Sequence, residues 1–156
     1  MFQDTEWASM YHAYDSLPEA MKARLEGIRA IHVFDQDLNP RLPPSDTRFR
    51  DKHSKELRQR TPPVVHPLVR THPATGRKSL YVNPTHVIRI AGMPEAEGDG
   101  LLAELYWYML QPNAEYRHKW RAGDVVIWDN RCTVHSAAGG YPSNERRIHW
   151  RTTVMQ

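Results

Sequence analysis

The stretch from Asp124 to Val154 places the strongest constraint on the fold of this 156-residue chain. At its end, in the run RIHWRTTV, basic side chains alternate with Ile, Trp, Thr and Val. A period of two is typical of a β-strand with one buried face. The pattern therefore predicts a strand on which Arg147, His149 and Arg151 share a face.

Two arginines on an inward strand face need anionic partners, because an unpaired buried charge is strongly unfavourable. The guanidinium fork of Arg147 or Arg151 matches a carboxylate, which suggests one or two small organic acids as ligands. The alternative is that both arginines face water or pair with carboxylates of the protein, as most charged residues do. Their spacing alone leaves both interpretations open.

Composition favours a folded single domain over residues 1–156, since 40% of the residues are hydrophobic and there are neither internal repeats nor a linker. The single cysteine, Cys132, excludes an intrachain disulfide and points to a reducing cytoplasm. No signal peptide or membrane span is recognisable, so no membrane partner is expected. A formal charge of +3 is too small to indicate nucleic acid, but it suits an acidic small molecule.

The first part of the chain predicts two helices. Asp4 can cap the first, in which Trp7 and Met10 begin an apolar stripe, and Pro18 opens the second, which ends near His32. Residues 35–63 are rich in proline and basic side chains without apolar periodicity, and they predict a flexible basic loop.

Later segments alternate between strands and one long helix. Residues 66–71 and 79–82 predict a hairpin, and we expect no metal site at His66 or His72 because no carboxylate accompanies them. Residues 94–111 predict a helix that ends before Pro112. A second hairpin is expected from strands 115–120 and 124–128, with a buried run at 125–127, and a further strand begins at 133–135.

Several motifs together resemble the TauD/TfdA family of Fe(II)- and 2-oxoglutarate-dependent dioxygenases. They are Trp128-Asp129-Asn130-Arg131 followed by His135 and the arginine strand, and also the runs HPLVRTHP at 66–73, TGRK at 75–78, LYVN at 80–83 and YRHKW at 116–120. The likeness extends from about residue 4 to 154 in the same order.

The resemblance assigns roles residue by residue. It implies that His135 is an iron ligand of a 2-His-1-carboxylate triad and that Arg147 pairs with the distal carboxylate of 2-oxoglutarate. Arg151 would meet the anionic group of the substrate, and Trp128 and Asn83 would line the pocket. The loop 141–146 is one residue longer than in the taurine dioxygenase of this family. Arg147 is therefore a better match than Arg146 to the family's 2-oxoglutarate-binding arginine.

The fold that the resemblance implies is α+β: an antiparallel double-stranded β-helix, the cupin-like jelly roll, with flanking helices. The family's other two ligands lie in a His-X-Asp motif, and this sequence contains none. We therefore expect an incomplete barrel that corresponds to the C-terminal portion of the domain. An exposed sheet edge of such a barrel would invite pairing with another chain, including a homo-oligomer.

Three functional hypotheses follow. The first is a dioxygenase that uses Fe(II), 2-oxoglutarate and O2 to hydroxylate a small anionic substrate, with release of succinate and CO2; this chain in isolation is then expected to be inactive. The second is a non-catalytic family fragment with an anion-binding pocket at Arg147 and Arg151. The third is a module that pairs with an intact homologue.

Overall fold

The computed structural model describes residues 4–34, 39, 59–138 and 150–154. Its elements follow one another in the order β1 (Thr5–Ser9), α1 (Met10–Asp15), α2 (Glu19–Arg24), β2 (Arg29–His32), β3 (Val64–Pro67), β4 (Val69–Thr71), β5 (Lys78–Leu80), β6 (Val87–Ile90), α4 (Glu95–Met109), the 3-10 turn η2 (Pro112–Ala114), β7 (Glu115–His118) and β8 (Thr133–Ala137).

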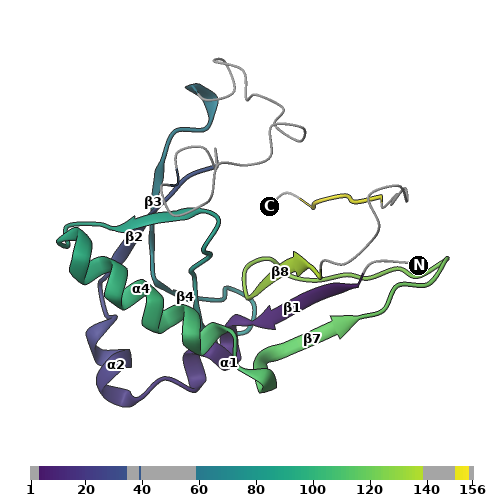
Figure 1. The fold of residues 1–156 in the computed structure, drawn as a ribbon, viewed down its shortest axis with the longest axis horizontal. Coiled ribbons are helices and arrows are strands. Elements are labelled where there is room, and N and C mark those ends of the chain that lie inside the picture. Colours follow the sequence, from purple (N-terminus) through teal and green to yellow (C-terminus); the bar gives the residue numbers. More distant parts are fainter. Residues whose placement is uncertain (1–3, 35–38, 40–58, 139–149, 155–156) are drawn as a thin grey trace.

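The strands form three small antiparallel sheets. One has the order β7-β1-β8, the second β3-β2-β6, and the third pairs β4 with β5. In Figure 1 the first sheet extends to the right of α1, whereas β2 and β3 of the second lie above α4. Each central strand, β1 or β2, precedes both of its partners in the sequence, so both sheets depend on contacts that are distant along the chain.

The core forms where α4 lies along β6 and α1. Gly98 lets the helix approach β6 closely, since an added Cβ would lie 3.4 Å from Cβ of Ile90. The most completely buried side chains are apolar and come from helices and strands alike: Met10, Leu25, Leu68, Leu80, Val87, Ile90, Leu101, Leu102 and Leu105. This core fixes the helices against the first two strands and so positions β1 at the centre of its sheet.

The predicted first helix is wrong at its start. Trp7 lies on strand β1, and the helix begins only at Met10, after Ser9 accepts a hydrogen bond from the backbone N–H of His12 at 3.3 Å. Asp4 is therefore not the helix cap; its carboxylate pairs with Arg117 at 2.7 Å. The spacing of Trp7 and Met10 suggested a helix, but residues 5–9 fit the period of two of a strand as well.

The predicted helix end at His32 is also wrong, since this residue closes strand β2. A turn containing Gly27, at φ +74°, ends the α2 segment before the strand begins. A left-handed glycine is a common helix terminator, and it was the signal for this boundary.

The second predicted hairpin is correct only in part. Residues 115–118 form β7, but this strand pairs with β1, and residues 124–128 form no strand. The run expected to be buried is open to solvent: Val125 is 85% and Ile127 92% exposed.

Other predictions are confirmed. The long helix is α4, and the strand that carries His135 is β8. The hairpin predicted from residues 66–71 and 79–82 is correct in part: β4 pairs with β5, but residues 66 and 67 belong to β3, which pairs with β2. The mixed helix and antiparallel sheet content agrees with the predicted class. Residues 35–38 and 40–58 lie outside the described residues, and so do residues 147–149 of the predicted arginine strand. The rest of that strand prediction is wrong, since residues 150–154 form no strand, and Trp150 and Val154, expected on the buried face, are 97% and 86% exposed. Within the part of the chain that is described, no helix is long and apolar enough to cross a bilayer.

Candidate functional site

His135 lies on strand β8 beside two tryptophans. Trp7 on β1 is its direct cross-strand neighbour, with the rings stacked at a centroid distance of 6.3 Å. Trp128 lies 5.1 Å from the same imidazole and 5.5 Å from Trp7. We call these three residues the His135 cluster. Since β1 holds Trp7 and the segment before β8 holds Trp128, both ends of the sequence build the surroundings of the imidazole.

The same sheet face continues across β1 to β7. Tyr116 is the cross-strand neighbour of Trp7 on that side, with a ring distance of 6.1 Å. One pleat along the strands, Thr5 lies between His118 and Ala137. Residues two apart on a strand share a face, so these side chains and the His135 cluster line one surface.

The environment of His135 favours its neutral form. Partial burial lowers the pKa of the imidazole from its ordinary value, and the positive charge of Arg151 lowers it further. A neutral imidazole has a free lone pair, which is the form that binds a metal ion. The ring remains accessible, because His135 is exposed to solvent. Its neighbour Trp7, in contrast, is buried.

The predicted binding residues are distributed as follows. Trp128 is part of the His135 cluster, and its indole N–H donates to Oδ1 of Asn130 at 2.8 Å, which fixes the ring. Arg151 is close enough to act on the charge of His135. Arg147 lies outside the described residues.

Asn83 is engaged in a turn. Its Oδ1 accepts from the backbone N–H of Thr85 at 2.8 Å, so the side chain stabilises the connection into β6. Its role as a pocket residue stays a prediction.

An arrangement that the sequence did not suggest lies at the end of β7. Nε2 of His118 donates to Oδ2 of Asp124 at 2.9 Å, and Nδ1 lies 3.1 Å from the hydroxyl of Tyr116. The backbone N–H of Arg121 is the main reason that the pKa of Asp124 is lowered, so this carboxyl group stays ionised. His118 is thereby oriented on the same face as the His135 cluster. The alternation of 116 and 118 on one strand was the only signal for it.

The loop after Trp128 is held by Asp129. Its carboxylate accepts from Arg131 at 2.6 Å and from Nε2 of His72 at 3.0 Å, and its backbone oxygen accepts from the hydroxyl of Thr133 at 2.7 Å. These contacts hold the pKa of Asp129 well below its usual range, with the Arg131 hydrogen bond as the largest cause. The loop is thus fixed directly before the strand that presents His135.

Three side chains here have the composition of a metal site: potential ligand atoms of His72, Asp129 and Cys132 lie within 4.8 Å of one another. The hydrogen bonds argue against that use. Nδ1 of His72 accepts the backbone N–H groups of Ala74 and Thr75, so Nε2 carries the proton that Asp129 accepts. Burial raises the pKa of the Cys132 thiol, which keeps it protonated. The cluster is therefore a structural contact.

A second histidine group lies at the other sheet. His32 packs against His66 at a ring distance of 5.2 Å and against Tyr81 at 5.3 Å, with the guanidinium of Arg70 4.5 Å from the Tyr81 ring. Burial, then the charges of His66, His86 and Arg70, lower the pKa of His32 to about 4. The imidazole of His32 is therefore neutral at pH 7.

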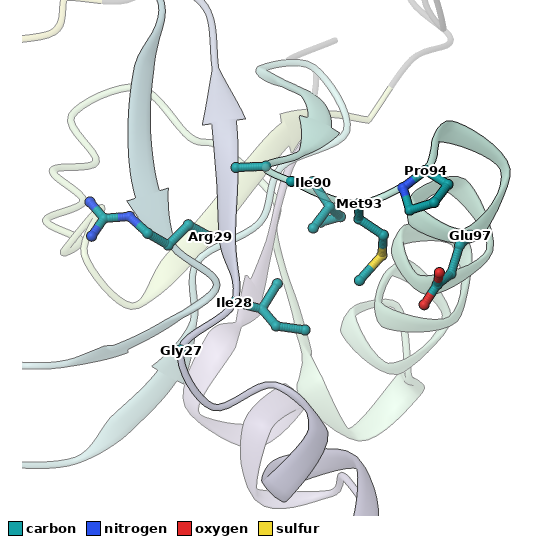
Figure 2. A pocket seen from close by; sticks show the side chains of 9 residues that line it. Gly27, Ile28, Arg29, Ile90, Met93, Pro94 and Glu97 are labelled. Carbon is teal, nitrogen blue, oxygen red and sulfur yellow. The ribbon is translucent and has the colours of Figure 1, made fainter.

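Figure 2 shows a shallow hollow between the turn before β2 and the turn before α4. Its floor is apolar, from Ile28, Ile90 and Met93. The guanidinium of Arg29 points away from it and donates to the backbone oxygen of Val65, and Glu97 pairs with Arg24. The hollow thus offers no convergent polar groups to a ligand.

Comparison with known proteins decides the family. The family described as taurine catabolism dioxygenase TauD, TfdA family, matches residues 4–153. This chain belongs to the TauD/TfdA family. The match includes His135, Trp128 and Arg151, as well as Trp7, which sequence reasoning had assigned to a helix.

Curated relatives share 33–43% identity with the chain. The alpha-ketoglutarate-dependent 2,4-dichlorophenoxyacetate dioxygenase of Burkholderia sp. (strain RASC) is 43% identical over 97% of this chain and 48% of its own length. The alpha-ketoglutarate-dependent sulfate ester dioxygenase of Pseudomonas putida is 34% identical over 93% of this chain and 48% of its own length. The chain spans about half the length of these relatives.

Solved structures show the same relation. AAD-2, crystallised in complex with Mn(II) and N-oxalylglycine, matches at a TM-score of 0.71 and 37% identity, over 87% of this chain and 50% of its own. A taurine dioxygenase from Burkholderia xenovorans matches at a TM-score of 0.70 and 32% identity, over 88% and 42%. The fold described above is therefore shared with about half of each of these solved structures.

Proposed function

We propose that this chain provides part of the active site of an Fe(II)- and 2-oxoglutarate-dependent dioxygenase that hydroxylates a small anionic substrate. The observation that carries the proposal is the accessible, neutral imidazole of His135 against Trp7 and Trp128, within a chain of the TauD/TfdA family. The relatives' names support the reaction class, since they are alpha-ketoglutarate-dependent dioxygenases.

The residues near His135 suit one ligand of an iron centre. A neutral imidazole nitrogen is a common donor to Fe(II), and the hydrogen-bonded indole of Trp128 restricts the movement of the ring. When bound, the iron with 2-oxoglutarate and O2 would supply the oxidising power for hydroxylation, with succinate and CO2 as co-products. The sequence supplies no His-X-Asp for the other two positions of the triad.

The other groups have binding roles in this proposal. Arg147 holds the distal carboxylate of 2-oxoglutarate, and Arg151 attracts the anionic group of the substrate toward His135. Trp7 and Trp128 exclude water from one side of the imidazole. Asn83 lines the pocket from the connection before β6.

The proposal extends to the fold. We infer that residues 1–156 form one domain, the C-terminal part of a double-stranded β-helix, to which the sheets β7-β1-β8 and β3-β2-β6 contribute opposite walls. The flexible basic loop at 35–63 and the cytoplasmic location stay predictions.

The activity can be tested in a chimera. This chain replaces the matching half of the Burkholderia 2,4-dichlorophenoxyacetate dioxygenase, and succinate formation is followed with and without 2-oxoglutarate and iron. We expect succinate production that requires both. His135→Ala should lower it at least about 100-fold, whereas His12→Gln on α1 should retain it. Equal activity of the His135→Ala chimera would refute the assignment.

A second arm tests the chain alone, by anaerobic calorimetric titration with 2-oxoglutarate, with and without Fe(II). We expect no metal-dependent binding. Binding without metal that Arg147→Ala abolishes would favour the non-catalytic anion-binding fragment. Iron-dependent binding would show that the chain itself completes the site.

A further inference from the structure

Two histidines, a tyrosine and an arginine meet beside the sheet β3-β2-β6. The imidazoles of His32 on β2 and His66 on β3 lie 5.2 Å apart, and the ring of Tyr81 lies 5.3 Å from the first and 5.4 Å from the second. The guanidinium of Arg70 on β4 stacks on the Tyr81 ring at 4.5 Å. All four residues are half-buried, so each has a part that faces solvent. We call these four residues the His32 cluster.

Strand pairing brings the members of the His32 cluster together. His66 is the cross-strand partner of Ala30, and the side chain of His32, two residues further along β2, leaves the same face. Tyr81 directly follows β5, which pairs with β4, the strand of Arg70. The cluster is therefore held by strands of two sheets and not by a single loop.

No carboxylate offsets the basic groups of the His32 cluster. The titratable and charged groups that act on the imidazole of His32 are all basic, namely His66, His86 and Arg70. Arg70 and Arg29 act on His66 in the same sense. Among the described residues, Arg70 has no acidic partner. A half-buried guanidinium without an anion is unfavourable, because it has lost part of its hydration.

A second arginine of the chain shows the usual arrangement. Arg77 stacks on the ring of Tyr11 at 4.3 Å, much as Arg70 stacks on Tyr81. The guanidinium of Arg77, however, also lies 2.9 Å from Oδ2 of Asp15. The two stacks thus differ in one respect, which is that only the guanidinium of Arg77 has an anion beside it.

The histidines show the same contrast. Nε2 of His72 lies 3.0 Å from a carboxylate oxygen of Asp129, and Nε2 of His118 lies 2.9 Å from one of Asp124. Nε2 of His32 is buried and has no hydrogen-bond partner among the described residues. Unsatisfied buried polar atoms are rare in native proteins, and a bound ion is one explanation for them. Local arrangements that sacrifice stability in this way are expected at functional sites.

We propose that the His32 cluster is a binding site for a small oxyanion, a sulfate, phosphate or carboxylate group held between Arg70 and the two imidazoles. Stacking on Tyr81 uses the face of the guanidinium and leaves the N–H groups in its plane for the anion. Charge-assisted hydrogen bonds from a guanidinium and from imidazole N–H groups are the contacts that such a group takes. The site goes beyond the proposed dioxygenase function and requires neither iron nor 2-oxoglutarate.

The site is tested first in the wild-type chain. NMR spectra of the imidazole nitrogens are recorded during titration with sodium sulfate, with the ionic strength kept constant by sodium chloride. We expect saturable shifts at His32 and His66 with a Kd below about 10 mM. His72 and His118 should not shift, because carboxylates already occupy their nitrogens. Shifts of equal size at all four histidines, or shifts that do not saturate, would overturn the proposal.

Variants at the two arginine stacks provide the matched comparison. Arg70→Gln should weaken sulfate binding at least about tenfold, because it removes both the charge and the donor fork. Arg70→Lys keeps the charge without the fork and should have an intermediate affinity. Arg77→Gln removes an arginine that already has Asp15 as its partner, so it should bind sulfate like the wild type. An Arg70→Gln chain with unchanged affinity would refute the site. If that variant does not fold, the wild-type titration decides alone.

Binding should also strengthen as the pH falls, because a bound anion favours protonated imidazoles. Sulfate keeps its charge between pH 7.5 and 5.5, so the change reports on the protein. The groups that face the cluster and carry or accept a positive charge are His32, His66, His86, Arg70 and Arg29. We expect the affinity to rise several-fold over this range, and His66→Gln should reduce the rise. Affinity that does not depend on pH would contradict a site built from the two histidines.

The source of the oxyanion is identified by comparing sulfate, inorganic phosphate and acetate. Tighter binding of acetate would indicate the carboxylate of an organic acid, and tighter binding of sulfate or phosphate would indicate the inorganic ion or its ester. His135→Ala should leave all three affinities unchanged, since His135 lies on β8 of the other sheet. Loss of binding in that variant would place the anion at the His135 cluster and refute the site at His32, whereas the chimera test of activity would stand unaffected.

Discussion

Nε2 of His72 lies 3.0 Å from Oδ2 of Asp129, and this contact joins the turn between β4 and β5 to the loop that precedes β8. The imidazole is almost fully buried, with 5% of its side chain exposed. Its other nitrogen accepts the backbone N–H groups of Ala74 and Thr75. One side chain thus fixes both its own turn and the loop that holds Trp128.

Loss of this contact is expected to destabilise the fold. His72→Ala leaves the two N–H groups without their acceptor and removes one donor from the carboxylate of Asp129, which keeps Arg131, at a cost of about 2–4 kcal/mol in the free energy of unfolding. Asp15→Asn is the matched control, since it breaks the exposed ion pair with Arg77 on the same turn and should cost less than about 1 kcal/mol. Urea denaturation followed by circular dichroism measures both. Similar losses for the two variants would contradict the special role of His72.

Two glycines of α4 are expected to respond in opposite ways. Nothing lies within 4 Å of a Cβ at position 100, so Gly100→Ala should raise the free energy of unfolding by about 0.5–1 kcal/mol through helix propensity alone. At position 98 a Cβ already lies 3.4 Å from Ile90, so Gly98→Val should crowd β6 and lower stability by about 1–3 kcal/mol. Thermal unfolding of both variants provides the comparison. A stabilising Gly98→Val would show that α4 does not pack against β6 as described.

The elements that sequence predicted correctly are those with local signals. Helix α4 has apolar residues at helical spacing between two prolines, and the turn between β4 and β5 contains Gly76 at φ +69°. These patterns depend on contacts within the element or with an adjacent one, so a single sequence shows them.

The elements that sequence missed depend on distant partners. Trp7 fits a helical stripe and a strand equally well, and only pairing with residues 116 and 135 selects the strand. The run at 125–127 has the composition of a buried strand, but composition does not show whether anything covers it. For the same reason the cluster of Trp7, Trp128 and His135 could not be derived without a family resemblance.

Cys132 is expected to react slowly in the folded protein. Burial leaves it 9% exposed and raises the pKa of its thiol, so little thiolate is present at pH 7.5. Alkylation by iodoacetamide should be at least about tenfold slower in buffer than in 6 M urea, after correction for the effect of urea on a model thiol. Equal rates would mean that the loop around Asp129 opens readily, and His72→Ala offers a direct check because it should accelerate labelling.

Stability should fall as the pH decreases from about 6.5 to about 4, because of His32. Its pKa is about 4 in the folded state and near 6.5 when unfolded, so between these values the unfolded chain binds more protons than the folded one. This destabilisation by His32 is absent above pH 6.5 and complete below pH 4. The groups that face His32, namely His66, His86 and Arg70, all disfavour its positive charge. With allowance for partial solvent access, the loss should amount to about 2–3 kcal/mol.

His32→Phe isolates this effect from other groups that titrate in the same range. Phenylalanine can keep the packing on Tyr81, and it sacrifices no hydrogen bond at Nε2, which has no partner among the described residues. The difference in unfolding free energy between the variant and the wild type, measured by urea denaturation, should therefore shift in favour of the variant as the pH falls from 7 to 4. A difference that stays constant over this range would show that His32 is protonated as readily in the folded chain as in the unfolded one, which would contradict its burial between His66 and Tyr81.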